Sequence, residues 1–287
     1  MRLSVDTFAV SHAMGDVQAL KAIKNAGFDC CDFSFWTFGE DKIGDNDSYA
    51  MWAKELRRLM DSIGLICNQA HAPFTITRQD YNPDMADKKY RELVRSMECA
   101  AILGAPYIVV HAVGKETDGG HEFDLHFYKD LEKWCEKFRI KVAVENIYIE
   151  DPKTGKKFSR LCSSKQQSAL VRELGTDHFT ALVDLGHAAI LGIRPEDYLL
   201  GMDASLISGL HVHDTDFRED LHVPPYHADH NWDAIMKALA EIGYKGDLSM
   251  ELCSYLHRFD RDVLPDALTF AAKIGRHLID KFDAYCA

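Results

Sequence analysis

Eight strand-like segments alternate with helix-like segments along this 287-residue chain, and this order predicts a (β/α)8 TIM barrel. The predicted strands are nearly continuous apolar runs, which are typical of parallel strands buried on both faces. The alternative is an open doubly wound sheet with two edge strands, but no predicted strand carries the charge or proline that protects an edge. No linker-like stretch divides the chain, so we predict a single domain, residues 1–287.

The predicted strands are apolar runs that end at a polar or turn-forming residue. They cover residues 2–8, 28–33, 65–70, 106–110, 140–144, 179–183, 207–213 and 247–250.

Helical spacing of apolar residues and suitable capping residues define the predicted helices. The first begins at Asp16 and ends at Gly27, and a later one begins at Asn231 and ends at Gly243. Glycine is favoured just after a helix because it adopts the left-handed conformation without strain. The predicted helices cover residues 16–27, 47–64, 84–104, 123–138, 165–174, a short segment opened by Pro195, residues 231–243, and a final helix from about residue 261.

Composition excludes several classes of protein. The formal net charge is -12, which argues against broad attraction to nucleic acid or to an anionic membrane. None of the eight cysteines forms a CxxC pair, and most lie in apolar runs, so we expect free thiols in a reducing compartment. We find no signal-peptide core and no run long enough to span a bilayer. We therefore expect a cytoplasmic protein that is not bound to membrane.

Residues 210–232 are the stretch that is hardest to explain as scaffold. Histidines and aspartates crowd this segment, from His211 and His213 at the end of a strand to His230 beyond the Pro224-Pro225 loop. Buried polar groups must be paired or they destabilise the fold. A solvated polar loop would explain the composition, but imidazoles and carboxylates together also suit divalent metal ions.

Six consecutive predicted strands end in a metal-ligand residue type. These residues are His71, His111, Glu145, Asp184, His211 and Glu251. In a barrel all strands end at one face, which carries the active site, so we predict that these side chains meet there. Three carboxylates and one imidazole, on Glu145, Asp184, His211 and Glu251, favour Mn, Mg or Co, with Zn also possible.

The other ligand types form two further candidate groups. His71 and His111 could share Glu145 as a bridge to a second ion, or they could hydrogen-bond substrate or the ligand carboxylates. His187, Asp220 and His222 could form a third group or contact substrate. Trp36 and Phe74, with Phe35, could form an aromatic wall for a sugar or polyol, although core packing would explain each ring as well.

These residues lie in motifs that resemble the xylose-isomerase-like barrel superfamily, which includes sugar-phosphate isomerases and epimerases and endonuclease IV. The motifs are Gln69-Ala70-His71-Ala72-Pro73, Val109-Val110-His111, Val144-Glu145-Asn146, Asp184-Leu185-Gly186-His187, His211-Val212-His213-Asp214 and His222-Val223-Pro224-Pro225, with Glu251 after the last strand. The resemblance covers almost the whole chain and implies a TIM barrel. It departs from the sugar-isomerase branch at Tyr226-His227-Ala228-Asp229, where that branch often has a glycine-rich turn.

The resemblance to the ketose epimerases implies one ion on Glu145, Asp184, His211 and Glu251. There the two glutamates are catalytic: they move substrate protons through an enediolate, while His187 and Arg218 are candidates for holding substrate hydroxyls. The resemblance to endonuclease IV implies instead a three-zinc phosphodiesterase on abasic DNA, because all nine ligand types match. They are His71, His111, Glu145, Asp184, His187, His211, Asp220, His222 and Glu251.

We favour a metal-dependent isomerase or epimerase of a sugar or sugar phosphate over a nuclease. The segment at residues 36–47 carries four acids and one lysine, which would repel duplex DNA. A basic segment argues the other way, although a solvated lid would explain it; it contains Lys153, Lys156, Lys157, Arg160 and Lys165. A dehydratase of a cyclic polyol or keto acid, a binding protein without turnover, and a homo-oligomer remain open at this point.

Overall fold

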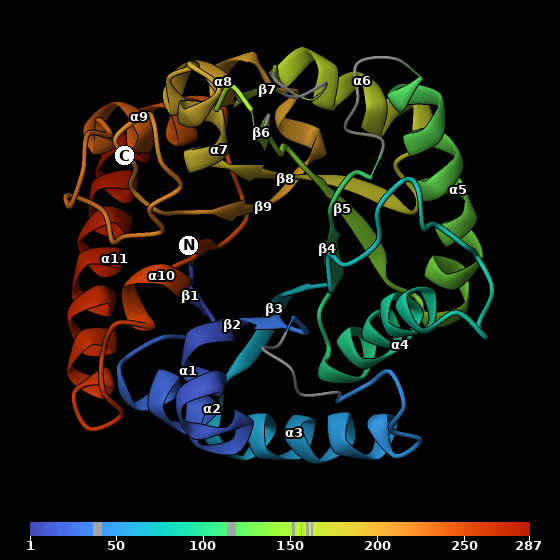
Figure 1. Ribbon diagram of the computed structural model, residues 1–287. Helices are drawn as coiled ribbons and strands as arrows, with labels where there is room; N and C mark the ends of the chain where they lie inside the picture. The colour runs from blue at the N-terminus through green and yellow to red at the C-terminus, as the bar shows by residue number, and fades with distance from the viewer. Residues whose placement is uncertain (37–41, 114–118, 151–152, 156, 159–160, 162) are drawn as a thin grey trace.

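The computed structural model describes residues 1–287 except 37–41, 114–118, 151–152, 156, 159–160 and 162. Its main sheet has eight parallel strands in the order β10-β1-β2-β3-β4-β5-β8-β9, which form a ring inside the helices (Figure 1). These strands are β1 (Leu3–Asp6), β2 (Cys30–Ser34), β3 (Ile66–His71), β4 (Tyr107–Val110), β5 (Lys141–Glu145), β8 (Phe179–Asp184), β9 (Ile207–His211) and β10 (Leu248–Met250).

The ring is nearly closed between its first and last strands. β9 and β10 form no regular ladder, but Val212 makes a parallel bridge to Met250 just beyond β9. The Val212 N–H donates to Ser249 O at 2.8 Å, and the Glu251 N–H donates to Val212 O at 3.1 Å. The predicted TIM barrel is confirmed, and the open doubly wound alternative is wrong.

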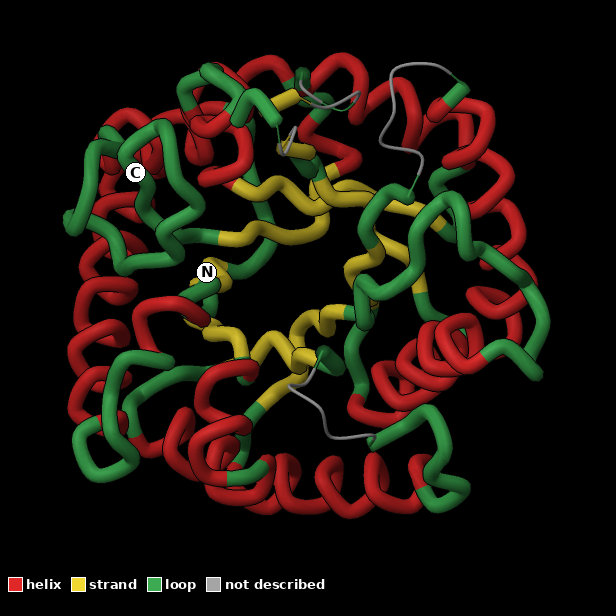
Figure 2. The backbone as a smooth tube through the Cα atoms, in the orientation of Figure 1, coloured by secondary structure: helices red, strands yellow, loops and turns green. Residues whose placement is uncertain are grey.

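Helices surround the ring of strands, as the red and yellow tubes of Figure 2 show. They are α1 (Phe8–Met14), α2 (Asp16–Asn25), α3 (Tyr49–Ile63), α4 (Lys88–Leu103), α5 (Gly120–Phe138), α6 (Ser164–Leu174), α7 (Leu185–Ile190), α8 (Pro195–Gly201), α9 (Trp232–Glu241), α10 (Cys253–Leu256) and α11 (Leu264–Cys286), with a 3-10 turn at Ala204–Leu206. Within the described ranges, no helix combines the length and the apolar character that crossing a membrane requires.

Several predicted boundaries shift for local reasons. The first strand ends at Asp6 rather than at Phe8, because Phe8 begins α1 and its N–H donates to Asp6 Oδ2 at 3.2 Å. α4 begins at Lys88 because the Asp87 side chain caps it, accepting from the Tyr90 N–H at 3.0 Å. The long segment after β5 contains an unpredicted antiparallel pair, β6 (Ile149–Glu150) and β7 (Lys157–Phe158).

The barrel interior is partly polar. Tyr107 of β4 reaches across to β9, where its hydroxyl lies so near Gly209 that a Cβ there would be 2.3 Å away. The Gln69 side chain from β3 meets the Tyr107 hydroxyl at 3.0 Å and Asp32 of β2 at 2.8 Å. Gln69 therefore joins the Tyr107 hydroxyl to Asp32 Oδ2 inside the barrel, where buried polar groups need partners.

Candidate metal centre and active site

A cavity of about 340 Å³ opens at the carboxyl-terminal ends of the strands. Its wall combines ligand-type residues with aromatic rings and with the ends of β1 and β2. The lining residues are Asp6, Phe8, Asp32, Ser34, Trp36, His71, Phe74, His111, Glu145, Ile147, Tyr148, His187, Asp220, His222, Glu251 and Cys253. A volume at the low end of the range for ligand pockets suits one small molecule.

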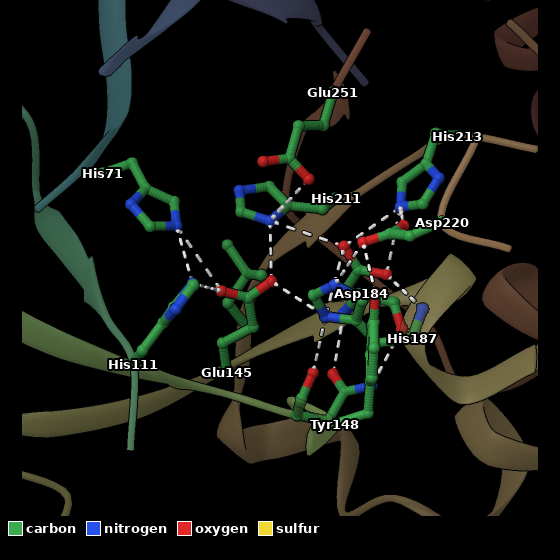
Figure 3. A network of polar contacts seen from close by, with 12 residues as sticks. His71, His111, Glu145, Tyr148, Asp184, His187, His211, His213, Asp220 and Glu251 are labelled. Atoms are coloured by element: carbon green, nitrogen blue, oxygen red, sulfur yellow. Dashed lines mark hydrogen bonds and ion pairs between the residues drawn. The ribbon is translucent and has the colours of Figure 1, made fainter. Parts of the chain in front are cut away.

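The predicted four-residue group converges around one nitrogen. His211 Nδ1 lies 3.0 Å from Glu145 Oε1, 3.4 Å from Glu251 Oε2 and 3.7 Å from Asp184 Oδ2 (Figure 3). One ligand atom from each of the four residues lies within 4.8 Å of all the others. Three of the side chains end their strands and are buried, whereas Glu251 follows β10 and is 18% exposed.

His71, His111 and Glu145 form a second group that shares Glu145 with the first. His71 Nε2 and His111 Nε2 are 3.1 Å apart, and they lie 3.6 Å and 2.9 Å from Glu145 Oε2. Glu145 therefore turns one carboxylate oxygen to each group. This placement fits a Glu145 carboxylate that bridges two ions, one of the alternatives left open in the sequence analysis.

His187, Asp220 and His222 form the third group. Asp220 Oδ2 lies 3.3 Å from His187 Nε2, and Asp220 Oδ1 lies 3.1 Å from His222 Nε2. The Tyr148 hydroxyl donates to Asp220 Oδ2 at 3.3 Å. His213, His222 and Glu251 also bring ligand atoms within 4.8 Å of one another, so the groups overlap.

A buried aspartate folds the loop that carries Asp220 and His222. Asp214 accepts from the His230 N–H at 3.0 Å and from Trp232 Nε1 at 3.0 Å, which ties both ends of the loop together. His222 has a φ of 43° and Tyr226 a φ of 70°, conformations that non-glycine residues rarely adopt. Such backbone is retained where surrounding contacts fix it, commonly at functional sites.

The Asp-Leu-Gly-His motif after β8 is explained by close packing. His213 Nε2 lies 3.2 Å from both carboxylate oxygens of Asp184. A Cβ on Gly186 would be only 2.0 Å from His213 Cε1, so a larger residue at Gly186 would displace the imidazole that holds Asp184. Asp184 in turn caps α7 by accepting from the His187 N–H at 2.6 Å.

The donor set fits a divalent ion. Two buried ligand-type atoms of these groups, His222 Nδ1 and Glu251 Oε2, have no hydrogen-bond partner among the described residues. Buried polar atoms are almost always partnered, so each such atom needs an explanation. Imidazole nitrogens and carboxylate oxygens facing one another across short gaps are the arrangement that a cation stabilises.

Opposite charges at close range set the ionisation of the cluster. Burial alone would raise the pKa of Glu145, but His211 and His111 outweigh it and hold the pKa well below its usual range. Burial opposes charge on His187 as well, yet Asp184 and Asp220 raise its pKa to about 10. The Glu145 carboxylate therefore stays ionised beside a protonated His187.

An aromatic wall lines the cavity beside the group of His71 and His111. Trp36 stacks on Phe8 and on Phe74, each at a centroid distance of 4.7 Å, and Phe74 stacks on His111 at 5.0 Å. Trp36 and Phe74 therefore lie where the sequence placed them. Phe35 does not line the cavity: it is buried and packs on Phe33 at 5.1 Å, and Phe8 takes the place expected for it.

Arg218 is exposed and is not among the residues that line the cavity, so its expected contact with substrate stays a prediction. The acidic segment is partly neutralised, because Asp45 pairs with Lys88 and Arg91 at 2.9 and 2.8 Å, and Asp47 with Arg95 at 3.2 Å. Glu40 and Asp41 of that segment, and Lys156 and Arg160 of the basic one, lie outside the described residues.

Sequence reasoning missed Asp6 and Asp32, which line the cavity from the ends of β1 and β2. Both are aspartates in otherwise apolar strands, and that signal could have found them. Burial, then the nearby Glu251, raises the pKa of Asp6 to about 7. Asp32 Oδ2 lies 3.1 Å from His211 Nε2, on the side of the imidazole away from the ligand carboxylates.

The family model of the xylose isomerase-like TIM barrel matches residues 20–274. A curated relative, "Uncharacterized protein y4fM" of Sinorhizobium fredii (strain NBRC 101917 / NGR234), is 27% identical over 169 residues, 56% of this chain. The aligned region spans about half, 51%, of that relative.

Three solved structures are similar over nearly the whole of both chains. A D-tagatose 3-epimerase-like protein has a TM-score of 0.74 at 18% identity and covers 100% of each chain. D-Psicose 3-epimerase, solved in the presence of D-fructose, has a TM-score of 0.72 at 14% identity, covering 97% of this chain and 99% of that one. An IolI protein with a binding zinc atom has a TM-score of 0.71 at 17% identity, covering 99% of each. At these identities the similarity establishes the fold.

Proposed function

This chain belongs to the xylose isomerase-like TIM barrel family, and on that premise we propose that it is a metal-dependent isomerase or epimerase of a small sugar or sugar phosphate. The observation that carries the proposal is the group of Glu145, Asp184, His211 and Glu251, which gathers around His211 Nδ1 and contributes Glu145 and Glu251 to the wall of a small cavity. The sugar epimerases and the zinc-containing protein among the structural neighbours support it.

The chemistry that a bound divalent ion supplies at such a site is polarisation of a carbonyl and stabilisation of the negative charge that forms when the adjacent carbon loses a proton. Glu145 and Glu251 lie on opposite sides of His211 (Figure 3). Glu251 is the more accessible, 18% exposed against 1% for Glu145, so we assign it the first proton transfer. Glu145 then returns a proton from the other side, which it takes from the protonated His187, whose Nδ1 lies 3.4 Å from Glu145 Oε1.

The other lining residues orient the substrate. Trp36 and Phe74 offer ring faces to its C–H groups, and Tyr148, His187 and Asp220 offer hydrogen bonds to its hydroxyls. Return of the proton to the opposite face of the same carbon gives epimerisation. Return to the neighbouring carbon gives aldose–ketose isomerisation, and loss of a β-hydroxyl gives dehydration.

A crystal soaked in Mn²⁺ or Zn²⁺ is expected to show an ion bound by Glu145, Asp184, His211 and Glu251 at about 2.0–2.4 Å. These four offer ligand atoms already within 4.8 Å of one another, so only small side-chain shifts are needed. Anomalous scattering at the metal edge locates the ion. An ion bound elsewhere, with these four side chains turned apart, would contradict the assignment.

One observation favours a second candidate, a phosphodiesterase of the endonuclease IV type. All nine ligand-type residues of the sequence belong to four overlapping groups, one of which adds His213, and Glu145 belongs to two of them. Such a constellation could hold more than one ion and could bind phosphate. We rank it second because no lysine or arginine lines the cavity within the described part of the chain, whereas DNA phosphates need such cations.

We therefore expect no incision of abasic DNA at an enzymatic rate. The test incubates the zinc-loaded protein with an abasic-site duplex at physiological salt, with an unmodified duplex as substrate control. The sugar assignment would be overturned by rapid incision that the His111→Ala variant loses, because His111 belongs to the second group and not to the first.

A further inference from the structure

We infer that Asp32 is a positioning residue for His211: its carboxylate accepts the Nε2 proton of that imidazole and so presents the Nδ1 lone pair to the four-residue group. The inference rests on the proposed metal site and extends it to a residue outside the ligand set. Asp32 lies in β2 and His211 ends β9, so the contact crosses the barrel interior rather than joining neighbouring strands.

The geometry separates the two ring nitrogens of His211. Nε2 lies 3.1 Å from Asp32 Oδ2, whereas Nδ1 faces Glu145, Glu251 and Asp184 at 3.0, 3.4 and 3.7 Å. His211 and Asp32 are 0% and 2% exposed, so water does not take the place of either partner. The ring is also held face to face with His71, at 5.6 Å and an interplanar angle of 14°.

The hydrogen bonds around Gln69 and Asp32 show which of their atoms donate and which accept. The Tyr107 hydroxyl lies 3.0 Å from both Gln69 Oε1 and Ser208 O, and the Gln69 amide nitrogen faces Asp32 Oδ2 at 2.8 Å and Leu210 O at 3.5 Å. Both of these atoms are acceptors, so the amide cannot be flipped without placing oxygen against oxygen. Asp32 Oδ2 therefore accepts the hydrogen bond from the Gln69 amide nitrogen.

An acceptor at Asp32 requires a proton on His211 Nε2. If that nitrogen were unprotonated, two acceptors would face each other at 3.1 Å in a buried site, which is costly. A neutral imidazole with its proton on Nε2 has its lone pair on Nδ1. The path Tyr107–Gln69–Asp32 therefore selects the tautomer of His211 that can bind a cation and fixes the angle of the ring.

The test measures metal binding at His211 directly. Protein labelled with ¹⁵N-histidine is titrated with Zn²⁺, and the His211 ring signals, identified by their loss in His211→Gln, report both tautomer and occupancy. In wild type we expect the proton on Nε2 and zinc on Nδ1. Asp32→Ala should weaken zinc binding at this nitrogen by roughly 10- to 100-fold, the usual effect of losing such a partner. Asp32→Asn keeps a carbonyl acceptor and should recover part of the loss.

A control separates positioning from general destabilisation. Ser4→Ala removes an equally buried interior bond, from Ser4 Oγ to Asn68 Oδ1 at 2.7 Å. It should lower the melting temperature and leave zinc binding at His211 Nδ1 unchanged. The inference is overturned if folded Asp32→Ala binds zinc as tightly as wild type, or if zinc in the wild type is bound by His211 Nε2 instead of Nδ1.

Failure of this inference and failure of the proposed function are distinguishable. Zinc binding that depends on Asp32, in a protein that turns over no sugar, would remove the proposed function and keep the positioning role. Metal-dependent turnover of a sugar, with zinc affinity unaffected in the folded Asp32 variants, would keep the proposed function and remove the positioning role of Asp32.

Discussion

Replacing Glu251 by glutamine is expected to lower kcat by roughly 10²- to 10⁴-fold, the contribution typical of a positioned general base. The amide is nearly isosteric but cannot take a proton from substrate. Because Glu251 is the most exposed of the four proposed ligands, the fold should tolerate the change with little effect on the melting temperature. Steady-state kinetics on the best substrate of a sugar screen gives the number.

Metal content must be measured on the same sample, because the amide is also a weaker ligand. Glu98→Gln is the matched control: Glu98 is half-buried and accepts one hydrogen bond, from the Tyr49 hydroxyl at 2.7 Å, but does not line the cavity. It should keep wild-type turnover. A Glu251→Gln enzyme that retains its metal and near-normal kcat would refute the assigned role.

Removing divalent ions with a chelator is expected to abolish turnover and to destabilise the protein. The ligand carboxylates and imidazoles then lose the cation that stabilises their close packing. An ion present at one hundred times its Kd contributes about 2.7 kcal/mol to stability, all of which disappears on chelation. Activity assays and thermal melts with and without chelator measure both effects, and adding back Mn²⁺, Co²⁺, Mg²⁺ or Zn²⁺ in turn identifies the ion that restores them.

The Asp184→Asn variant is the control for this experiment, because its melting temperature should respond much less to chelator and to added metal. Turnover that survives exhaustive chelation in the wild type, with no change in the melting temperature, would remove the ion from the mechanism.

The barrel and the assembly of its ligand-type residues were predictable from sequence because both depend on strand ends. An apolar run predicts a strand, and parallel strands all end at one face, so His71 and Glu145 could be placed together without coordinates. Cavity-facing residues beyond the strand ends were less predictable. Phe8 lines the cavity because α1 begins directly after β1, a turn that apolar periodicity does not indicate.

The supporting contacts could not be predicted, because they cross the barrel. The contact of Asp32 with His211 depends on the diameter and register of a closed ring, and so does the approach of Tyr107 to Gly209. Arg218 was placed by analogy in a loop whose path depends on Asp214 and on the positive φ of His222. Loop conformation of this kind is set by tertiary contacts rather than by local pattern.

The central claim is that this site moves a proton on a sugar carbon next to a carbonyl, with the help of a divalent ion. Its most direct measurement is solvent exchange: the metal-loaded protein is incubated in D₂O with a panel of ketoses, their phosphates and inososes, and the C–H signals beside the carbonyl are followed by ¹H NMR. We predict deuterium incorporation into at least one sugar, abolished by chelator and by Glu251→Gln. No exchange in any sugar, together with incision of abasic DNA by the same loaded protein, would contradict the account.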